Sequence, residues 1–311
     1  MNDPHLRDGS VRLSHWGVIR ARGVDAASFL QGQLTNDVQG IAPDAVRLAG
    51  YCSAKGRLQA SFIVWMAAPD DFLLACSASV LPATLKRLSM FVLRAKCRLS
   101  DASDDVRLHG RLGPSGADWP GGLPVWRHRG GAVDAVLRLP DVGSVARCIV
   151  VGPAEPTEPI ESSDTRSLPL DVWRQLEVES GLPVIESATV DQFVPQMLNY
   201  EVVGGVDFGK GCYPGQEVVA RSHYRGTIKR RMFLFDGDAP TLPGTEVFHS
   251  ADPSQPAGMV VNAAANGNGG CCALVEVKLA ALESGTLHIG EANGPALHRR
   301  PLPYALPGEA G

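Results

Sequence analysis

Cys212 and Lys210 are the two residues of this chain whose types and spacing most directly suggest chemistry. A cysteine thiolate is a nucleophile and a metal ligand, and a nearby lysine or a helix N-terminus favours the thiolate over the thiol. The residues after Pro214 predict a helix over 216–223 that stops near Gly226, so Cys212 should lie just ahead of a helix N-terminus. We therefore take Cys212, assisted by Lys210, as the candidate reactive group. The spacing leaves open a second interpretation, in which the cysteine fills space in a tight turn.

Composition limits the classes of protein that this chain can belong to. It has 311 residues, 44% of them hydrophobic and 20% charged, which is ordinary for a globular protein of two domains or more. A formal net charge of −4 argues against bulk electrostatic capture of nucleic acid or of an anionic membrane. No apolar run is long enough to span a membrane, and residues 1–12 contain no apolar stretch typical of a secretory signal. We expect a cytoplasmic protein.

The seven cysteines are scattered and contain no Cys-x-x-Cys pair. This pattern indicates neither a disulfide framework nor a metal site, and it suits a reducing compartment. The adjacent residues Cys271 and Cys272 fall in a predicted strand, where alternate side chains face opposite ways. We therefore expect one of them to point inward and the other outward.

The elements that must position these residues follow from hydrophobic periodicity and from glycine and proline punctuation. Strands are predicted over 16–23, 47–52, 57–66, 71–76 and from 96, and helices over 81–91, over 170–181 and after Asp25 as its cap. Residues 110–131 read as loop and 152–169 as an exposed connector. The order of elements predicts an α+β fold with mainly antiparallel sheets.

The last part of the chain has a different pattern. Short strands separated by Gly, Pro and Asn are predicted over 231–236, 246–249, 257–263, 271–278, 286–290 and 296–299. Such spacing fits a small β-barrel. We therefore divide the chain into residues 1–235, which could form two subdomains, and a C-terminal β-barrel over residues 236–311.

The segment around Cys212 resembles the signature of a known family. Lys-Gly-Cys-Tyr-Pro-Gly-Gln-Glu at 210–217, with Val-Val-Ala-Arg at 218–221 and Tyr-Arg-Gly at 224–226, is similar to the signature of the YgfZ family. These are folate-binding proteins related to the T-protein, the aminomethyltransferase of the glycine cleavage system. The resemblance extends to 29–38 and 50–57. It implies a T-protein-like folate-binding region and a role in iron–sulfur cluster assembly or repair and, through iron–sulfur enzymes, in tRNA modification.

The resemblance also implies which residues bind tetrahydrofolate or a one-carbon derivative of it. Glu179 matches the glutamate that holds the pterin ring in the T-protein, and a carboxylate suits that ring because it can accept two parallel N–H bonds. Basic residues of 225–231 would meet the glutamate tail. The full set is Glu179, Asn36, Gln196, Asn199, Tyr213, Gln216, Arg225 and Arg230. The alternative for Asn36 is a cap on backbone groups, and for Gln196 and Asn199 it is a loop that packs under the sheet. For Glu179 and the basic residues the alternative is a solvated position.

One departure from the T-protein bears on activity. The T-protein needs a carboxylate after the turn that corresponds to 54–56, whereas the stretch 58–61 here reads Leu-Gln-Ala-Ser. Without that group nothing obvious can orient or deprotonate an amine substrate. The resemblance therefore favours a folate-dependent accessory protein, acting with iron–sulfur assembly factors or client iron–sulfur enzymes, over an aminomethyl or methyl transferase. Whether a reaction is catalysed stays open.

One cysteine cannot hold an iron–sulfur cluster, which usually takes four protein ligands, so any contact of Cys212 with a cluster would be transient or shared. An RNA-binding factor that uses the basic patch 221–231 is the remaining alternative. The patch is short and the rest of the chain is acidic, so we expect no direct contact with nucleic acid.

Overall fold

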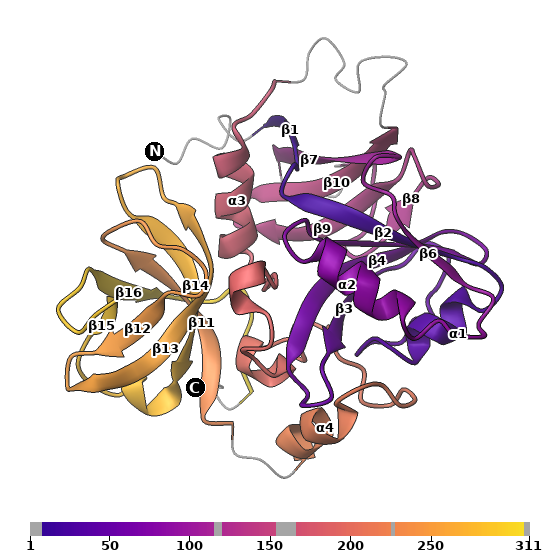
Figure 1. The fold of residues 1–311 in the computed structure, drawn as a ribbon. Coiled ribbons are helices and arrows are strands. Elements are labelled where there is room, and N and C mark those ends of the chain that lie inside the picture. Colours follow the sequence, from indigo (N-terminus) through magenta and orange to yellow (C-terminus); the bar gives the residue numbers. More distant parts are fainter. Residues whose placement is uncertain (1–7, 115–119, 154–165, 225–227, 308–311) are drawn as a thin grey trace.

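The chain forms two antiparallel β-sheets and a closed antiparallel β-barrel (Figure 1). The computed structural model describes residues 8–114, 120–153, 166–224 and 228–307. The first sheet has the strand order β3-β4-β5-β2-β6. Its strands are β2 Trp16–Arg22, β3 Val46–Cys52, β4 Leu58–Ala68, β5 Asp71–Ser77 and β6 Arg98–Asp101. Helices α1 (Ala26–Gln31) and α2 (Leu81–Ser89) pack against one face of this sheet through an apolar cluster that includes Phe29, Leu30 and Leu88.

The second sheet lies against the other face of the first. Its order is β1-β7-β10-β9-β8, with β1 Gly9–Arg12, β7 Val106–Pro114, β8 His128–Arg129, β9 Val136–Val142 and β10 Val145–Pro153. The main core fills the space between the two sheets and joins Trp65 of the first sheet to Leu137 of the second. Helix α3 (Leu170–Glu179) adds Trp173 and Leu176 to this core, and both are fully buried.

A closed six-stranded barrel follows, with the order β11-β14-β13-β12-β15-β16. Its strands are β11 Arg230–Gly237, β12 Glu246–His249, β13 Asp252–Ala265, β14 Cys271–Lys278, β15 Leu287–Ile289 and β16 Ala296–Arg300. Strand β11 crosses the boundary that we expected between residues 235 and 236. All of β11 belongs to the barrel, so the barrel begins at Arg230. Alternation along β14 places Cys271 in the barrel interior and Cys272 in the apolar contact with the first region, as expected for opposite faces.

Irregular segments and short helices connect these parts. They are the 3₁₀ helices η2 Ser187–Thr189, η3 Pro195–Leu198 and η4 Leu279–Leu282, and helix α4 Gln216–Tyr224. The segment 182–205 runs between the first sheet and the barrel, and its side chains Ile185, Phe193 and Leu198 pack with Met232 and Leu274 of the barrel. In Figure 1, α4 lies below the first sheet, well away from α3.

The α+β class, the mainly antiparallel sheets and the C-terminal barrel are confirmed. Two local expectations were wrong. Residues 110–114 are strand rather than loop, since they complete β7 in register with β1 and β10. Asp25 does not cap α1 with its side chain, because its carboxylate accepts instead from the backbone N–H of Lys96 at 2.7 Å. Among the described residues, no helix is long and apolar enough to cross a membrane.

Candidate functional site

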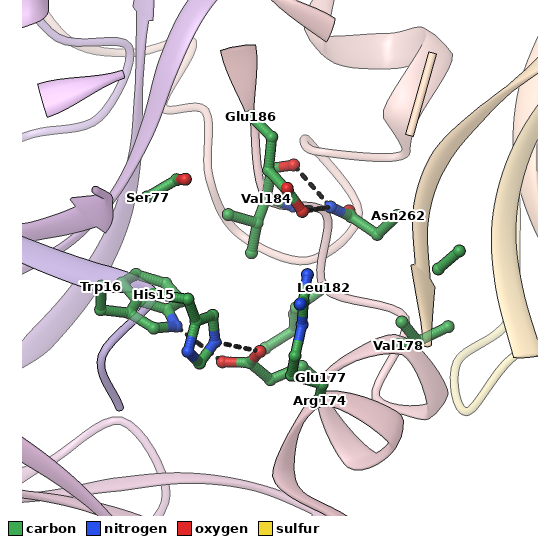
Figure 2. Close-up of a pocket in the computed structure, with 11 residues that line it drawn as sticks. His15, Trp16, Ser77, Arg174, Glu177, Val178, Leu182, Val184, Glu186 and Asn262 are labelled. Atoms are coloured by element: carbon green, nitrogen blue, oxygen red, sulfur yellow. Dashed lines mark hydrogen bonds and ion pairs between the residues drawn. The ribbon is translucent and has the colours of Figure 1, made fainter. Parts of the chain in front are cut away.

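A cavity lies where the first sheet, α3 and the barrel meet (Figure 2). Its walls come from the start of β2, the end of β5, one side of α3, the segment after α3, and β13 of the barrel. The lining side chains are His15, Trp16, Ser77, Arg174, Glu177, Val178, Leu182, Val184, Glu186, Asn262 and Ala263. In Figure 2 the carboxylate of Glu177 points toward His15 and Trp16, and the pair Glu186 and Asn262 closes the opposite side.

A second, more apolar cavity adjoins the first between the two sheets. The two cavities share Trp16, Glu177, Leu182 and Val184. The second is walled by apolar side chains of both sheets, namely Leu48, Phe62, Ile63, Leu139 and Ile149, with Pro183 at one side. Its polar residues are Ser61, Arg147, Ser180, Tyr200 and the shared Glu177. The two cavities thus share one wall, and their linings combine apolar side chains with a few polar groups, as small-molecule sites do.

Glu177 is held in one orientation by three donors from different elements. The indole Nε1 atoms of Trp16 and Trp173 each donate to Oε1 at 2.7 Å, and His15 Nε2 lies 2.8 Å from Oε2. Burial alone would raise the pKa of Glu177, but the bonds from His15, Trp173 and Trp16 outweigh it and hold the pKa below its ordinary value. The residue is therefore a fixed carboxylate at neutral pH, and with two donors on Oε1 and one on Oε2 it keeps one acceptor position, on Oε2, for a ligand.

Arg147 brings an incompletely bonded cation to the same place. Its side chain is almost fully buried, with 1% exposure, on β10. Nε donates to the carbonyl of Pro140 at 3.1 Å and Nη1 to that of Leu176 at 3.2 Å, while Nη2 has no partner among the described residues. Burial lowers the pKa of Arg147 to about 10, so the guanidinium remains charged at neutral pH.

Tyr200 provides a second buried donor without a partner. Its hydroxyl lies near the backbone of Phe62 but does not reach hydrogen-bond geometry with it or with any other described group. Buried polar groups are nearly always paired, so two unpaired donors in one cavity indicate that a ligand or water completes them. The cavity therefore offers the carboxylate of Glu177 as an acceptor, Arg147 and Tyr200 as donors, and apolar walls around them. A flat heteroaromatic molecule with both N–H groups and acceptor atoms on its edge would match these groups.

The segment around Cys212 forms a separate site. The side chain of Cys212 is exposed, so the space-filling alternative for this cysteine does not apply. Lys210 Nζ donates at 2.5 Å to the carbonyls of both Gln31 and Leu34, at and beyond the end of α1, and lies 5.0 Å from the ring centroid of the buried Tyr213. Burial lowers the pKa of Lys210 to about 8, against the neighbouring charges of Asp37 and Asp207. Lys210 therefore anchors the segment to the first sheet's helix.

The predicted amides make structural bonds. Asn36 donates to the carbonyls of Leu48 and Gly204, Gln196 to that of Val219 in α4, and Asn199 to that of Met232 in β11. Gln196 thus connects the segment 182–205 to α4, and Asn199 connects it to the barrel. Gln216 is the first residue of α4, and its backbone N–H donates to Tyr213.

The predicted charged residues face other protein groups. Glu179 accepts from Gln175 at 3.1 Å and from Arg300 of the barrel at 3.2 Å, with Asp236 on the same guanidinium. Both the Nε and the Nη2 of Arg230 bond the carboxylate of Glu276. Arg225 lies outside the described residues. None of the predicted site residues that the structure describes lines either cavity.

The same contacts disperse the basic patch of 221–231. Arg221 pairs with Glu217 one turn earlier on α4, Arg230 pairs with Glu276, and Arg231 is buried against Glu201. Of the cations in this stretch that the structure describes, only Lys229 has no ion pair. The described part of the patch therefore offers little free charge to a phosphate backbone.

Sequence reasoning missed Glu177, Arg147, His15, Trp16 and Tyr200. Two signals were present in the sequence. Glu177 is four residues after Trp173, on the apolar stripe of its helix, and Arg147 interrupts the apolar run 145–151. A charged group on a face that must be buried is either paired or functional. Nothing in the sequence indicated that His15 and Trp16 would meet α3, because they lie more than 150 residues away.

The chain is similar in sequence to several curated proteins. No family model matches the chain. It is 34% identical over 250 residues to the tRNA-modifying protein YgfZ of Edwardsiella ictaluri, a match that covers 77% of this chain and 74% of that protein. The protein of the same name from Photorhabdus laumondii is 30% identical over 308 residues, covering 95% and 92%. That of Sodalis glossinidius is 29% identical over 316 residues, covering 97% and 94%.

Among solved structures, the chain resembles the glycine cleavage system aminomethyltransferase T from Bartonella henselae. The TM-score is 0.76 at 18% sequence identity, and the match covers 97% of this chain and 88% of that one. At this identity the likeness establishes the fold, that is, the arrangement of the two sheets and the barrel.

Proposed function

The chain belongs to the YgfZ family of tRNA-modifying proteins, and from that premise we propose that it binds tetrahydrofolate or a one-carbon derivative in the cavity around Glu177 and thereby serves tRNA modification. The fold shared with a glycine cleavage aminomethyltransferase supports a folate-related role. One observation carries the proposal. The same apolar cavity is lined by the fixed carboxylate of Glu177 and by Arg147, whose Nη2 has no hydrogen-bond partner among the described residues.

The chemistry of these residues fits a pterin. One edge of a 2-amino-4-oxopterin presents N–H donors beside a carbonyl acceptor. A carboxylate can accept from the former and a guanidinium or phenol can donate to the latter. Trp16, Phe62, Leu139 and Ile149 supply apolar surface for the faces of the ring. When bound, a reduced folate would supply one-carbon or reducing chemistry, and the residues here would hold and orient its ring and keep water away.

We assign the pterin-holding role to Glu177 rather than to Glu179. Both lie on α3, but Glu177 lines both cavities while the carboxylate of Glu179 is engaged by Arg300 and Gln175. A helix advances about 100° per residue, so two residues apart means nearly opposite faces. Glu179 then has a structural part in the contact between α3 and the barrel.

We further propose that Cys212 acts outside this cavity, on an iron–sulfur cluster or client held by a partner. Its exposure and its absence from the cavity walls support this separation. Among the described residues no group of three or more His, Cys, Asp or Glu could hold a metal ion, so a cluster would need ligands from the partner. A transferase activity is less well supported. The T-protein needs a carboxylate in the stretch that corresponds to 58–61, and the residue of this stretch that lines the cavity here is Ser61, which has no carboxylate.

The test is isothermal titration of tetrahydrofolate into the wild type and two matched variants of α3. We expect Glu177→Gln to weaken binding about tenfold or more, because it removes a charge-assisted acceptor from a buried site. Glu179→Gln should bind like the wild type. Cys212→Ala should also bind normally, since the thiol does not line the cavity.

Three outcomes would count against parts of this proposal. If Glu179→Gln abolishes binding while Glu177→Gln does not, Glu179 holds the pterin. If the wild type gives no heat with any reduced folate, folate binding is wrong. Turnover of a methylated or aminomethylated amine with tetrahydrofolate would favour the transferase. Thermal unfolding of each variant separates lost binding from lost folding.

A further inference from the structure

The end of α2 and the turn that follows it form an exposed surface that combines apolar and basic side chains. The apolar members are Val24, Met90, Phe91 and Leu93, and the basic members are Lys86, Arg87, Arg94, Lys96 and Arg98. We refer to these residues as the α2 surface. Leu93 is 86% exposed, the largest value among the large hydrophobic residues that the structure describes.

The exposure of these apolar residues is built into the fold. Helix α2 buries Leu81, Thr84 and Leu88 against the first sheet, and Val92 packs into the same cluster, so Phe91 and Leu93 on either side of it point outward. Backbone bonds from Met90 to Arg87 and from Ala95 to Val92 order the turn. Leu93 adopts φ = 43°, a region that costs free energy for a leucine, so an ordered and exposed conformation is maintained at some expense.

The charged side chains that make up the α2 surface are all basic, and one carboxylate, that of Asp25, lies beside them on the backbone N–H of Lys96. No aspartate or glutamate occurs between Asp71 and Asp101, a stretch that contains five basic residues in a chain of net charge −4. The described residues give no ion-pair partner to Lys86, Arg94, Lys96 or Arg98, and Arg98 lies directly opposite Arg22 in the sheet. Unpaired like charges around an apolar patch are electrostatically unfavourable unless an acidic partner neutralises them.

A groove adjoins the exposed turn. Its apolar residues include Val80, Ala83, Met90 and Val190, and Lys86 and Arg87 lie at its edge. Its wall includes Ser79 and Ser187, which are joined by a 3.1 Å bond from the Ser187 N–H to the Ser79 hydroxyl. Their neighbours Ser77 and Glu186 line the cavity around Glu177. The groove and the ligand cavity thus lie on two sides of one pair of segments.

We propose that the α2 surface binds an acidic, amphipathic segment of a partner protein, with apolar side chains of that segment in the groove and against Phe91 and Leu93. A second copy of this chain is a poor occupant, since the same basic residues would face each other across a symmetric contact. Nucleic acid is also disfavoured, because Phe91 is the one ring among the apolar members and Val24, Met90 and Leu93 offer no face on which successive bases could stack. Exposed Met, Phe and Arg are typical of protein interfaces. The proposal does not depend on folate binding.

The experiment measures fluorescence anisotropy of a labelled synthetic helix about five turns long, with leucine along one face and glutamate elsewhere. Two peptides serve as control probes. One has the same composition in a scrambled order that forms no apolar face, and the other has lysine in place of every glutamate. We expect the wild type to bind the acidic amphipathic peptide in a salt-sensitive way and neither control. Leu93→Asp and Lys96→Glu should each weaken binding about tenfold.

The matched control variant is Leu242→Asp. Leu242 is 73% exposed and lies between β11 and β12 of the barrel, outside the α2 surface, so this variant should bind like the wild type. Leu93→Asp should fold, because aspartate tolerates the positive φ of this position better than leucine does. Failure of the wild type to bind the peptide, or unchanged binding by Leu93→Asp, would overturn the proposal. So would binding of unfractionated tRNA that these two substitutions abolish, since the surface would then serve nucleic acid.

Discussion

At the scale of single residues, Lys210 has a clear structural part. Its ammonium group joins the segment that presents Cys212 to two carbonyls at the end of α1. Cations suit helix C-termini because the last carbonyls of a helix lack partners and carry partial negative charge. The lysine of the motif thereby fixes the position of the exposed cysteine two residues later.

Lys210→Met should destabilise the protein by about 1–3 kcal/mol, because it leaves the carbonyls of Gln31 and Leu34 without their donor. Burial lowers the pKa of Lys210 from 10.5 to about 8, so the unfolded chain binds more protons between these values. The wild type should therefore gain stability relative to the variant as pH rises from about 8 toward 10.5. Urea unfolding at several pH values measures both effects.

The exposed Lys229 provides the control for this prediction. Lys229→Met removes the same charge without removing a bond to a helix end, so its effect should be small and nearly independent of pH. If Lys210→Met behaves like Lys229→Met, the anchoring role of Lys210 is wrong.

The two glutamates of α3 show what sequence could and could not predict at this scale. Helix 170–181 follows from its periodicity and its terminal glycine, and the structure has α3 over Leu170–Glu179. Which glutamate faces the cavity depends on how α3 is rotated against the sheets, and that is decided by Trp173, which is fully buried in the main core. Such rotation is set by packing between distant segments, so a match to a family motif could not reveal it.

At the scale of elements, the turn before α4 is held against the β3–β4 turn. Gly215 has φ = 79°, and a side chain there would overlap the carbonyl oxygen of Ser53 and the backbone of Gly56. Gly56, at φ = 71°, in turn lies against Val218 of α4. Two glycine turns from distant parts of the chain therefore pack backbone to backbone, and this contact orients the segment that contains Cys212.

Gly215→Ala should therefore cost more than the strain of a positive φ alone, which is about 1–2 kcal/mol. Gly267→Ala provides the comparison, since Gly267 has φ = 76° but no atom within 4 Å of an added Cβ. The difference between the two free energies of unfolding, measured in urea, gives the cost of the lost contact. Equal destabilisation by both substitutions would show that the two turns can separate without cost.

The elements themselves were largely predictable. Every barrel strand was expected within a few residues, because glycine, proline and asparagine separate short apolar runs there. The exceptions have tertiary causes. Residues 110–114 extend β7 because β1 and β10 flank them, and Asp25 is drawn from its expected cap by the backbone of Lys96, which lies 71 positions later.

At the scale of the whole molecule, Arg231 joins the barrel to the first region. Its Nη1 donates to Glu201 at 2.8 Å and to Asn199 at 3.1 Å, and the side chains of Arg231 and Glu201 are only 7% and 9% exposed. Removal of one member of a buried ion pair leaves the other charged and without a partner. This contact is thus a sensitive point between the two parts.

Arg231→Met should lower the free energy of unfolding by about 3–5 kcal/mol. Arg221→Met breaks an exposed pair within α4 and should cost about 1 kcal/mol at most. Scanning calorimetry also tests whether the barrel of Arg231→Met unfolds in a transition of its own. Equal effects of the two substitutions would mean that the buried pair adds no more than a surface pair.

The two adjoining cavities around Glu177 draw their walls from distant parts of the chain, from His15 just before β2 through Arg147 and Glu177 to Asn262 on the barrel. Neither sheet and not the barrel contains all of these walls by itself. A recombination event that transplanted either sheet or the barrel alone into another protein would leave the site behind. In evolutionary terms the cavities pass to a descendant protein only where both sheets, α3 and the barrel are inherited together.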